Sequence, residues 1–447
     1  MKAMFLIPGT GDFHCGSCLR DHALMRALRA EGCHCRAVPL YLPWVTDHTG
    51  DATGDDGDDG GAGRQRIFFG GINTFLDATT RWSARLPGPL RRALDAVALL
   101  RWTARFSHLT RPGDVGRLSV SMIEHAPQAH GHEIERLARF IGRDGRPDVL
   151  CLSNSMLIGI GTELGRRLER PIVCSMQGED AFIDQLPQPW RDQTWAAIAR
   201  RVPQVAGWIA PSRFHAGQMA QRLRCDRSRI KTVYNGIALP DDGIAGAPPA
   251  RTPTIGYLAR MHPSKGLDRL IDAWIAMQHR PRWAQAQLIV AGAMKRSDRP
   301  YVRRQRAKLA AAGAEHSVDW RANVTHAGKQ RMLQQITALC VPVTIPEAFG
   351  LYVIEAWSRG VPVIVPRIGA MPELCAIGGG WLYDPDRPAA LTDCLVEALA
   401  DPEQARALGR RGHQAVSEQF TDRHMARGFA RILRDAAAGP SPYGEAR

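Results

Sequence analysis

Two glutamates separated by seven residues, Glu347 and Glu355, are the side chains whose spacing most clearly suggests chemistry. Between them, Phe349 and Gly350 predict a tight turn, and residues 351–359 predict a helix. The first N–H groups of a helix have no partner within it, and the helix dipole favours an anion at that end. A turn followed by a helix can therefore bind a phosphate, and we expect such a site at Gly350 and Leu351.

The two carboxylates need another explanation, because they would repel a bound phosphate. A carboxylate readily accepts hydrogen bonds from hydroxyl groups. A ligand that carries both a diphosphate and hydroxyls is a nucleotide sugar, and this is the ligand we predict. The alternative is ordinary helix chemistry, with Glu347 stabilising the helix start and Glu355 on a solvated face. The Phe-Gly turn and the apolar run at 361–365 favour the ligand site.

The segment 346–350, Pro-Glu-Ala-Phe-Gly, together with Glu355 resembles the signature of the retaining GT-B glycosyltransferases of family four. The resemblance implies that Glu347 contacts the transferred sugar and Glu355 the ribose. It also implies that Phe349, Gly350 and Leu351 lie beside the donor, a nucleoside diphosphate sugar. No cofactor is expected, because this donor is a substrate.

Arg260 and Lys265 form a second charged group, in a loop between a predicted strand at 254–258 and a helix beginning near Gly266. A departing nucleoside diphosphate gains negative charge as the glycosidic bond breaks, so fixed cations lower the barrier. They would also make a divalent metal dispensable. The pattern Arg-x4-Lys-Gly resembles the diphosphate clamp of family four, which implies that role here. The alternative is a basic loop on a basic protein.

The first half of the chain offers weaker candidates. Gly16 follows the first predicted strand, where related transferases have a glycine loop that faces donor and acceptor. Gln177 follows another strand, near a position at which many relatives have a histidine beside the sugar; glutamine cannot shuttle a proton. Glu179 and Asp180 either contact the acceptor or cap the next helix. Gly369 follows the strand at 361–365 and could approach the donor.

Short apolar runs alternate with helical patterns along the chain, which is typical of parallel sheets covered by helices. In the second half we predict strands at 254–258, 287–291, 317–320, 339–345 and 361–365, and a turn at 378–380. We predict an α/β protein of GT-B architecture, with two doubly wound Rossmann-like domains facing across a cleft that holds the ligands. The predicted divisions are an acceptor-side domain at 1–238, a linker at 239–252, a nucleotide-sugar-binding domain at 253–421, and a helix at 422–447 that the resemblance sends back to the first domain.

Composition is ordinary for a globular protein of two domains, since the 447 residues are 45% hydrophobic and 23% charged. The net charge of +14 comes almost wholly from arginine. No nucleic-acid motif accompanies it, so we expect no nucleic-acid partner. Residues 81–108 mix arginines with tryptophan and leucine, as in a helix that rests on a membrane, although a helix packed on a domain has the same pattern. We expect a cytoplasmic protein, and peripheral contact with the inner face of the membrane stays open.

The cysteines do not predict a metal site. Cys15 and Cys18 form one pair, and Cys33 and Cys35 another. A helix between the pairs would separate them by roughly 20 Å, too far for one tetrahedral ion. A redox role for Cys15 and Cys18 stays open.

We therefore predict a metal-independent, retaining transferase that moves a sugar from a nucleoside diphosphate donor to an unidentified acceptor, which is a small molecule, a glycan or a lipid. Two rival functions stay open. A nucleotide-sugar epimerase on the same fold would need no acceptor. An inactive scaffold would bind the donor without turnover.

Overall fold

The computed structural model describes residues 1–9, 16–41, 112–143, 145–240, 252–440 and 443. Cys15, the predicted membrane-facing stretch at 81–108 and most of the predicted linker lie outside the described residues. The chain divides into two compact units. The first comprises Met1–Pro211, Ala216–Val233 and Met425–Arg447, and the second comprises Ser212–His215 and Tyr234–His424.

The first unit is built on a parallel sheet of six strands in the order β2-β1-β3-β4-β5-β6. The strands are β1 Lys2–Ile7, β2 His34–Pro39, β3 Val149–Leu152, β4 Ile172–Ser175, β5 Gly207–Ala210 and β6 Ile230–Thr232. The helices in this part of the chain are α1 Gly16–Ala30, α5 Pro112–Glu124, α6 Ala126–Arg143, α7 Ile158–Leu168, α8 Asp180–Ile183, α9 Trp190–Arg200 and α10 Arg213–Leu223.

Both faces of this sheet are covered. All four residues of β3 are buried, as expected for a strand with helices on each side. Leu150 and Leu152 belong to a hydrophobic cluster with residues of α5, α6 and α7. Val149 and Cys151 alternate with them and join the opposite cluster, which contains residues of α1 and of the last helix.

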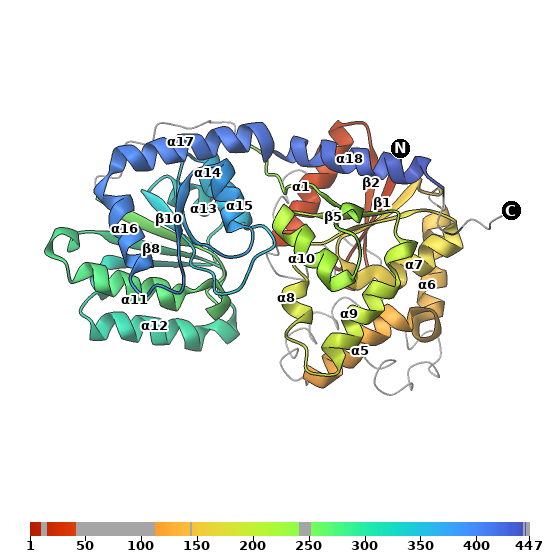
Figure 1. Cartoon of the computed structure of the whole chain (residues 1–447), viewed down its shortest axis with the longest axis horizontal. Coiled ribbons are helices and arrows are strands. Elements are labelled where there is room, and N and C mark those ends of the chain that lie inside the picture. Colours follow the sequence, from red (N-terminus) through yellow and green to blue (C-terminus); the bar gives the residue numbers. More distant parts are fainter. Residues whose placement is uncertain (10–15, 42–111, 144, 241–251, 441–442, 444–447) are drawn as a thin grey trace. The chain divides into compact units, whose positions relative to one another are not determined.

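The last helix, α18 Asp422–Ala438, completes the first core. Its residues Met425, Phe429 and Leu433 recur at the spacing of a helix face, and all three are buried in the same cluster as Phe5 of β1. Figure 1 shows α18, in blue, beside α1.

The second unit contains another parallel sheet of six strands, in the order β12-β11-β10-β7-β8-β9. The strands are β7 Thr254–Leu258, β8 Gln287–Gly292, β9 Val318–Ala322, β10 Ala338–Cys340, β11 Val363–Pro366 and β12 Gly380–Tyr383. The helices are α11 Leu267–Gln278, α12 Arg299–Ala311, α13 His326–Leu333, α14 Leu351–Ser358, α15 Met371–Ile377, α16 Ala390–Ala400 and α17 Pro402–Gln419. The predicted α/β class with two doubly wound parallel sheets is therefore confirmed.

Two predicted elements of the second unit need correction. The strand expected at 339–345 ends at Cys340, because Pro342 has no N–H to donate and the N–H of Val343 donates to the carbonyl of Val341 at 3.0 Å. The turn expected at 378–380 is wrong at Gly380, which begins β12. There Gly380 pairs with Val363 of β11, so a strand partner overrides the local preference of glycine for turns.

Candidate functional site

The carboxyl ends of β7, β8 and β10 bring three loops of the second unit together. These strands are neighbours in the sheet, and ligands of such sheets bind beyond the carboxyl ends of the strands. Arg260 follows β7, Asp298 lies in the loop after β8, and Glu347 lies in the segment after β10. The sheet order therefore places at one edge residues that are far apart in the sequence.

Arg260 is held in a fork by a carboxylate that the sequence analysis missed. Its Nε donates to Asp298 Oδ2 at 3.0 Å and its Nη2 to Asp298 Oδ1 at 2.8 Å. The side chain of Asp298 is 3% exposed, whereas that of Arg260 is 37% exposed. The main chain at Arg260 is also fixed, because its carbonyl accepts from the hydroxyl of Tyr257 at 3.0 Å. The guanidinium thus has one anchored edge and reaches solvent with the rest.

Two ionisable groups near Arg260 have shifted pKa values. Burial acts to raise the pKa of Asp298, but hydrogen bonds from Arg260 and from the Lys295 backbone outweigh it, so the pKa lies below its ordinary value. The pKa of His262 is lowered by burial and by the charge of Arg260. Nδ1 of His262 lies 3.3 Å from the backbone N–H of Ser264, as suits an acceptor on a neutral ring. At neutral pH the loop after β8 thus carries an ionised carboxylate and the loop after β7 an uncharged imidazole.

Lys265 and Glu347, which are 82 positions apart, form an ion pair between Nζ and Oε1. Lys265 ends a short 3-10 turn, Pro263–Lys265, and Gly266 follows with φ of 67°. A Cβ at Gly266 would lie 1.8 Å from the carbonyl oxygen of Pro342, so only glycine allows the two loops to approach this closely. The prediction that both residues lie at one site is consistent with this geometry.

Glu347 is enclosed by further contacts. Its side chain is 10% exposed. Burial, the charge of Glu347 and a hydrogen bond to it raise the pKa of Tyr352 well above its ordinary value. The carbonyl of Glu347 accepts from the N–H of Ala370 at 3.0 Å, and Gly369 lies against the Glu347 main chain. Gly369 thus helps to place Glu347, whereas its predicted approach to the donor is untested.

Gly350 immediately precedes α14 and lies in the left-handed region, with φ of 98°. A Cβ on Gly350 would lie 3.4 Å from Glu347 Oε2, so the carboxylate lies directly beside the helix start. Leu351, the first helical residue, is half-buried. The ring of Phe349 is buried and contacts Tyr234 and Phe420, with centroids 6.3 and 6.0 Å away. Only the main chain at Phe349 is therefore suited to touching a donor.

Glu355 has a partner that was not predicted. Lys329 Nζ, from α13, donates to Glu355 Oε1 at 2.7 Å, and the two side chains are 18% and 22% exposed. If Glu355 contacts the ribose as predicted, it does so while its carboxylate is also paired with Lys329. Nothing in the spacing of Lys329 pointed to it, because the contact depends on how α13 and α14 lie in the fold.

In the first unit, the predicted acceptor-side residues are engaged locally. Glu179 accepts from the backbone N–H groups of Ser155 at 2.8 Å and Gln177 at 2.7 Å. Its side chain makes no capping hydrogen bond to α8, so the expectation that it caps that helix is wrong. Asp180 begins α8 and is buried. Gln177 donates from Nε2 to the hydroxyl of Ser175 at 2.9 Å.

A buried arginine near these residues was also missed. Arg20 donates from Nη2 to the Ser175 hydroxyl at 3.3 Å and pairs with Asp21 at 3.2 Å. Gly16 begins the same helix, α1, and the preceding residues 10–15 lie outside the described part of the chain.

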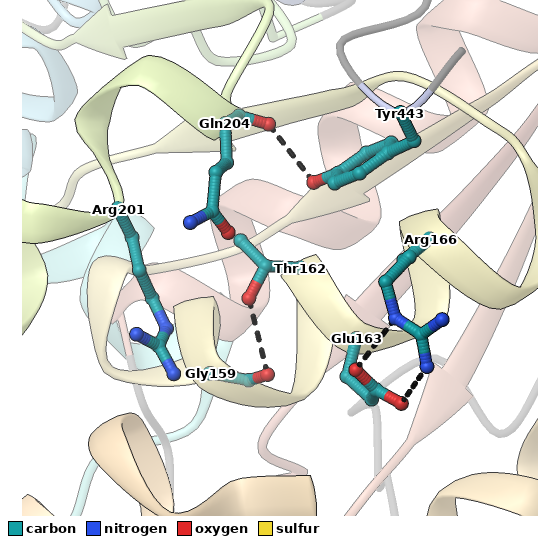
Figure 2. Close-up of a pocket in the computed structure, with 7 residues that line it drawn as sticks. All are labelled: Gly159, Thr162, Glu163, Arg166, Arg201, Gln204 and Tyr443. Atoms are coloured by element: carbon teal, nitrogen blue, oxygen red, sulfur yellow. Dashed lines mark hydrogen bonds and ion pairs between the residues drawn. The ribbon is translucent and has the colours of Figure 1, made fainter. Parts of the chain in front are cut away.

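A separate pocket of about 250 Å³ lies in the first unit, and none of the predicted residues lines it (Figure 2). Its lining residues are Gly159, Thr162, Glu163, Arg166, Arg201, Gln204 and Tyr443. Glu163 binds Arg166, and the hydroxyl of Tyr443 donates to the carbonyl of Gln204 at 2.9 Å. These polar groups are hydrogen-bonded to one another, and they do not form the arrangement that the predicted chemistry needs.

The described residues contain no group of three or more histidine, cysteine or acidic side chains placed to hold a metal ion. Among the same residues, none of the helices is long and apolar enough to cross a membrane. Burial raises the pKa of Cys35 to about 12, opposite to the shift of a reactive thiol. Cys15 and the side chain of Cys18 fall outside the description, so their redox role is untested.

Comparisons with known proteins agree with this architecture. A family model described as Glycosyl transferases group 1 matches residues 245–415, and one described as Glycosyltransferase Family 4 matches residues 103–239. Solved structures with the same fold include Anabaena HepE in complex with UDP (TM-score 0.66, 16% identity, 97% of this chain and 100% of that one). Sucrose-phosphate synthase from Thermosynechococcus elongatus is similar too (TM-score 0.66, 17% identity, 97% of this chain and 98% of that one).

Sequence relatives include trehalose synthase from Rubrobacter xylanophilus, which is 29% identical over 40% of this chain and 43% of its own length. Phosphatidyl-myo-inositol mannosyltransferase from Mycobacterium leprae is 25% identical over 67% of this chain and 75% of its own length. The chain thus aligns with less than half of the first relative and three quarters of the second. The two sheets and these matches define a GT-B glycosyltransferase. Within that class, the chain belongs to glycosyltransferase family four.

Proposed function

We propose that this chain transfers a glycosyl group from a nucleoside diphosphate sugar to an acceptor, with retention of the anomeric configuration. One observation carries the proposal: Lys265 and Glu347 are in contact beside the start of α14. Arg260 follows β7, the strand that also precedes Lys265, at the same edge of the sheet. A cation pair, a helix start and a carboxylate in that arrangement suit a diphosphate attached to a polyol.

The proposed roles follow from the hydrogen-bond donors and acceptors that these residues carry. Arg260 and Lys265 stabilise the charge that develops on the leaving diphosphate, and the first N–H groups of α14 at Gly350 and Leu351 bind the same group. An ammonium group has three N–H donors, so Lys265 can contact Glu347 and a phosphate together. The Glu347 carboxylate accepts from a sugar hydroxyl while it holds Lys265.

In this proposal the reaction is a front-side substitution, in which the leaving phosphate helps to deprotonate the acceptor. No protein carboxylate serves as a nucleophile, and Glu355 contacts the ribose. Because Arg260 and Lys265 supply positive charge at the diphosphate, we expect turnover that does not depend on a divalent ion. Activity that EDTA abolishes would contradict this expectation, and NMR of the product anomer tests retention.

The donor and acceptor classes rest on relatives. HepE was solved with UDP and with UDP-glucose, which supports a nucleotide-sugar donor here. The name of a relative from Segniliparus rotundus, D-inositol 3-phosphate glycosyltransferase, points to a small polyol. The M. leprae relative is named for a lipid. We place the acceptor on the first unit, near Gln177, Glu179 and Asp180.

Release of UDP, GDP or ADP from a panel of nucleotide sugars tests the proposal, with polyol, glycan and lipid-vesicle acceptors. Acceptor-dependent release supports a transferase. Conversion of the donor alone into an isomer would instead show an epimerase, and binding without turnover across all acceptors would show a scaffold. Sedimentation with anionic vesicles tests the predicted peripheral contact with the inner face of the membrane.

A further inference from the structure

Arg260 and Asp298 form the best-anchored ion pair at the candidate site. Asp298 binds two nitrogens of Arg260 and also accepts from the backbone N–H of Lys295 at 2.9 Å. Two loops of the second unit, one after β7 and one after β8, are therefore joined through one buried carboxylate. The pair differs from a surface salt bridge, which has little fixed geometry and contributes little energy.

We infer that Asp298 is a positioning residue that keeps the Arg260 guanidinium in its diphosphate-binding orientation throughout the reaction; this inference rests on the proposed function. The fork occupies Nε and Nη2. Nη1 makes no hydrogen bond within the described part of the chain, so its two N–H groups and the second N–H of Nη2 are left to meet a ligand. Asp298 itself cannot swing away easily, because its side chain is 3% exposed and tied to the main chain.

The charge of Asp298 allows its role to be distinguished from a purely structural role of joining two loops. An ionised carboxylate beside Arg260 offsets part of the guanidinium charge. Arg260 therefore binds the diphosphate mainly through directed N–H groups, and less through its positive charge. Removing that negative charge should strengthen attraction for a nucleoside diphosphate. Removing the fork should at the same time loosen the orientation on which transition-state stabilisation depends. Binding and turnover then change in opposite directions.

Asp298→Asn produces both changes with almost no change in volume. An amide has one acceptor oxygen, and its nitrogen only donates, so it cannot place a separate acceptor atom opposite each N–H group of the Arg260 fork. A residue that merely joined two loops would give another pattern. Loosened loops would weaken ligand binding and turnover together, or they would lower thermal stability and leave both unchanged.

The experiment measures kcat for nucleotide-sugar turnover and Kd for UDP and GDP by calorimetry. For Asp298→Asn we expect kcat to fall about 100-fold, the scale of losing one transition-state donor. We expect Kd to tighten about threefold to tenfold, because one partly screened negative charge is removed. Asp298→Glu keeps the charge and should recover part of kcat. Asp272→Asn, which breaks an exposed pair with Lys308, is the matched control.

A fall in kcat of tenfold or more without weaker nucleotide binding supports the inference. A smaller fall, or weaker binding in parallel with kcat, overturns it. A wild-type protein that binds neither UDP nor GDP and turns over no nucleotide sugar would refute the proposed function itself, and the inference with it. An active wild type with an overturning Asp298→Asn pattern refutes the role of Asp298 alone.

Discussion

Lys265→Met is the substitution that tests the proposed chemistry most directly. It keeps the length and apolar stem of the side chain and removes the ammonium group that contacts Glu347. Two consequences follow. The diphosphate loses a cation, and Glu347, whose side chain is 10% exposed, loses its ion-pair partner.

The expected loss in turnover can be estimated from electrostatics. Two unit charges about 4 Å apart interact by about 4 kcal/mol at an effective dielectric constant of about 20. Only the charge that develops as the glycosidic bond breaks counts toward kcat, and the Lys265 side chain is 30% exposed, so water screens part of it. We expect kcat to fall about 100- to 1,000-fold. The donor Kd should weaken by about tenfold or less.

The assay is steady-state release of nucleoside diphosphate, with donor Kd measured separately. Lys308→Met, in an exposed pair with Asp272, controls for loss of a lysine elsewhere in the second unit. The double variant Lys265→Met/Glu347→Gln removes the unpaired carboxylate, and it should regain donor affinity but not kcat. Equal losses in affinity and in kcat/KM, with kcat unchanged, would show uniform binding and refute the assignment of Lys265 to the leaving group.

Three further outcomes test the surrounding structure. Lys329→Met should raise the donor KM about threefold to tenfold, because Glu355 loses the partner that orients it, with kcat within about threefold; a large fall in kcat instead would contradict this. Gly266→Ala should destabilise the second unit by at least about 2 kcal/mol more than Gly313→Ala in urea unfolding. Both residues have a left-handed φ (67° and 68°), but only at Gly266 would the new Cβ lie 1.8 Å from a carbonyl oxygen. Equal losses of stability would refute the close contact. Because the pKa of His262 is lowered in the folded protein, the unfolded chain binds the proton more readily. The free energy of unfolding should therefore fall as the pH drops below the ordinary value of 6.5. His262→Gln should make the urea midpoint less dependent on pH in this range.

The sequence was sufficient to predict the alternation of strands and helices, because buried parallel strands such as Val149–Leu152 are continuous apolar runs. It also predicted that Lys265 and Glu347 belong to one site. Both lie just after strands, and the strands concerned, β7 and β10, are neighbours in the sheet. The start of α14 at Leu351 was predictable because Gly350 permits the left-handed turn before it.

Asp298 and Lys329 could not be predicted in the same way. Each is one charged residue among many in a basic segment, and its significance depends on which side chain the fold brings opposite it. Attention to every loop after a predicted strand would have included Asp298, since it follows the strand at 287–291. Phe349 shows the reverse case: it lies within the motif, but its ring belongs to an aromatic cluster with Tyr234 and Phe420.

The placement of α18 has a consequence for how this protein is made. Met425, Phe429 and Leu433 are buried in the same cluster as Phe5 of β1, so the first unit combines residues that precede the second unit in the sequence with residues that follow it. During synthesis, α18 can reach the apolar face of the first unit's sheet only after the second unit has left the ribosome. The second unit is continuous from Tyr234 to His424 apart from four residues, and it can fold earlier. A fragment expressed alone to study the acceptor side would therefore need the last helix supplied, by fusion or as a separate peptide.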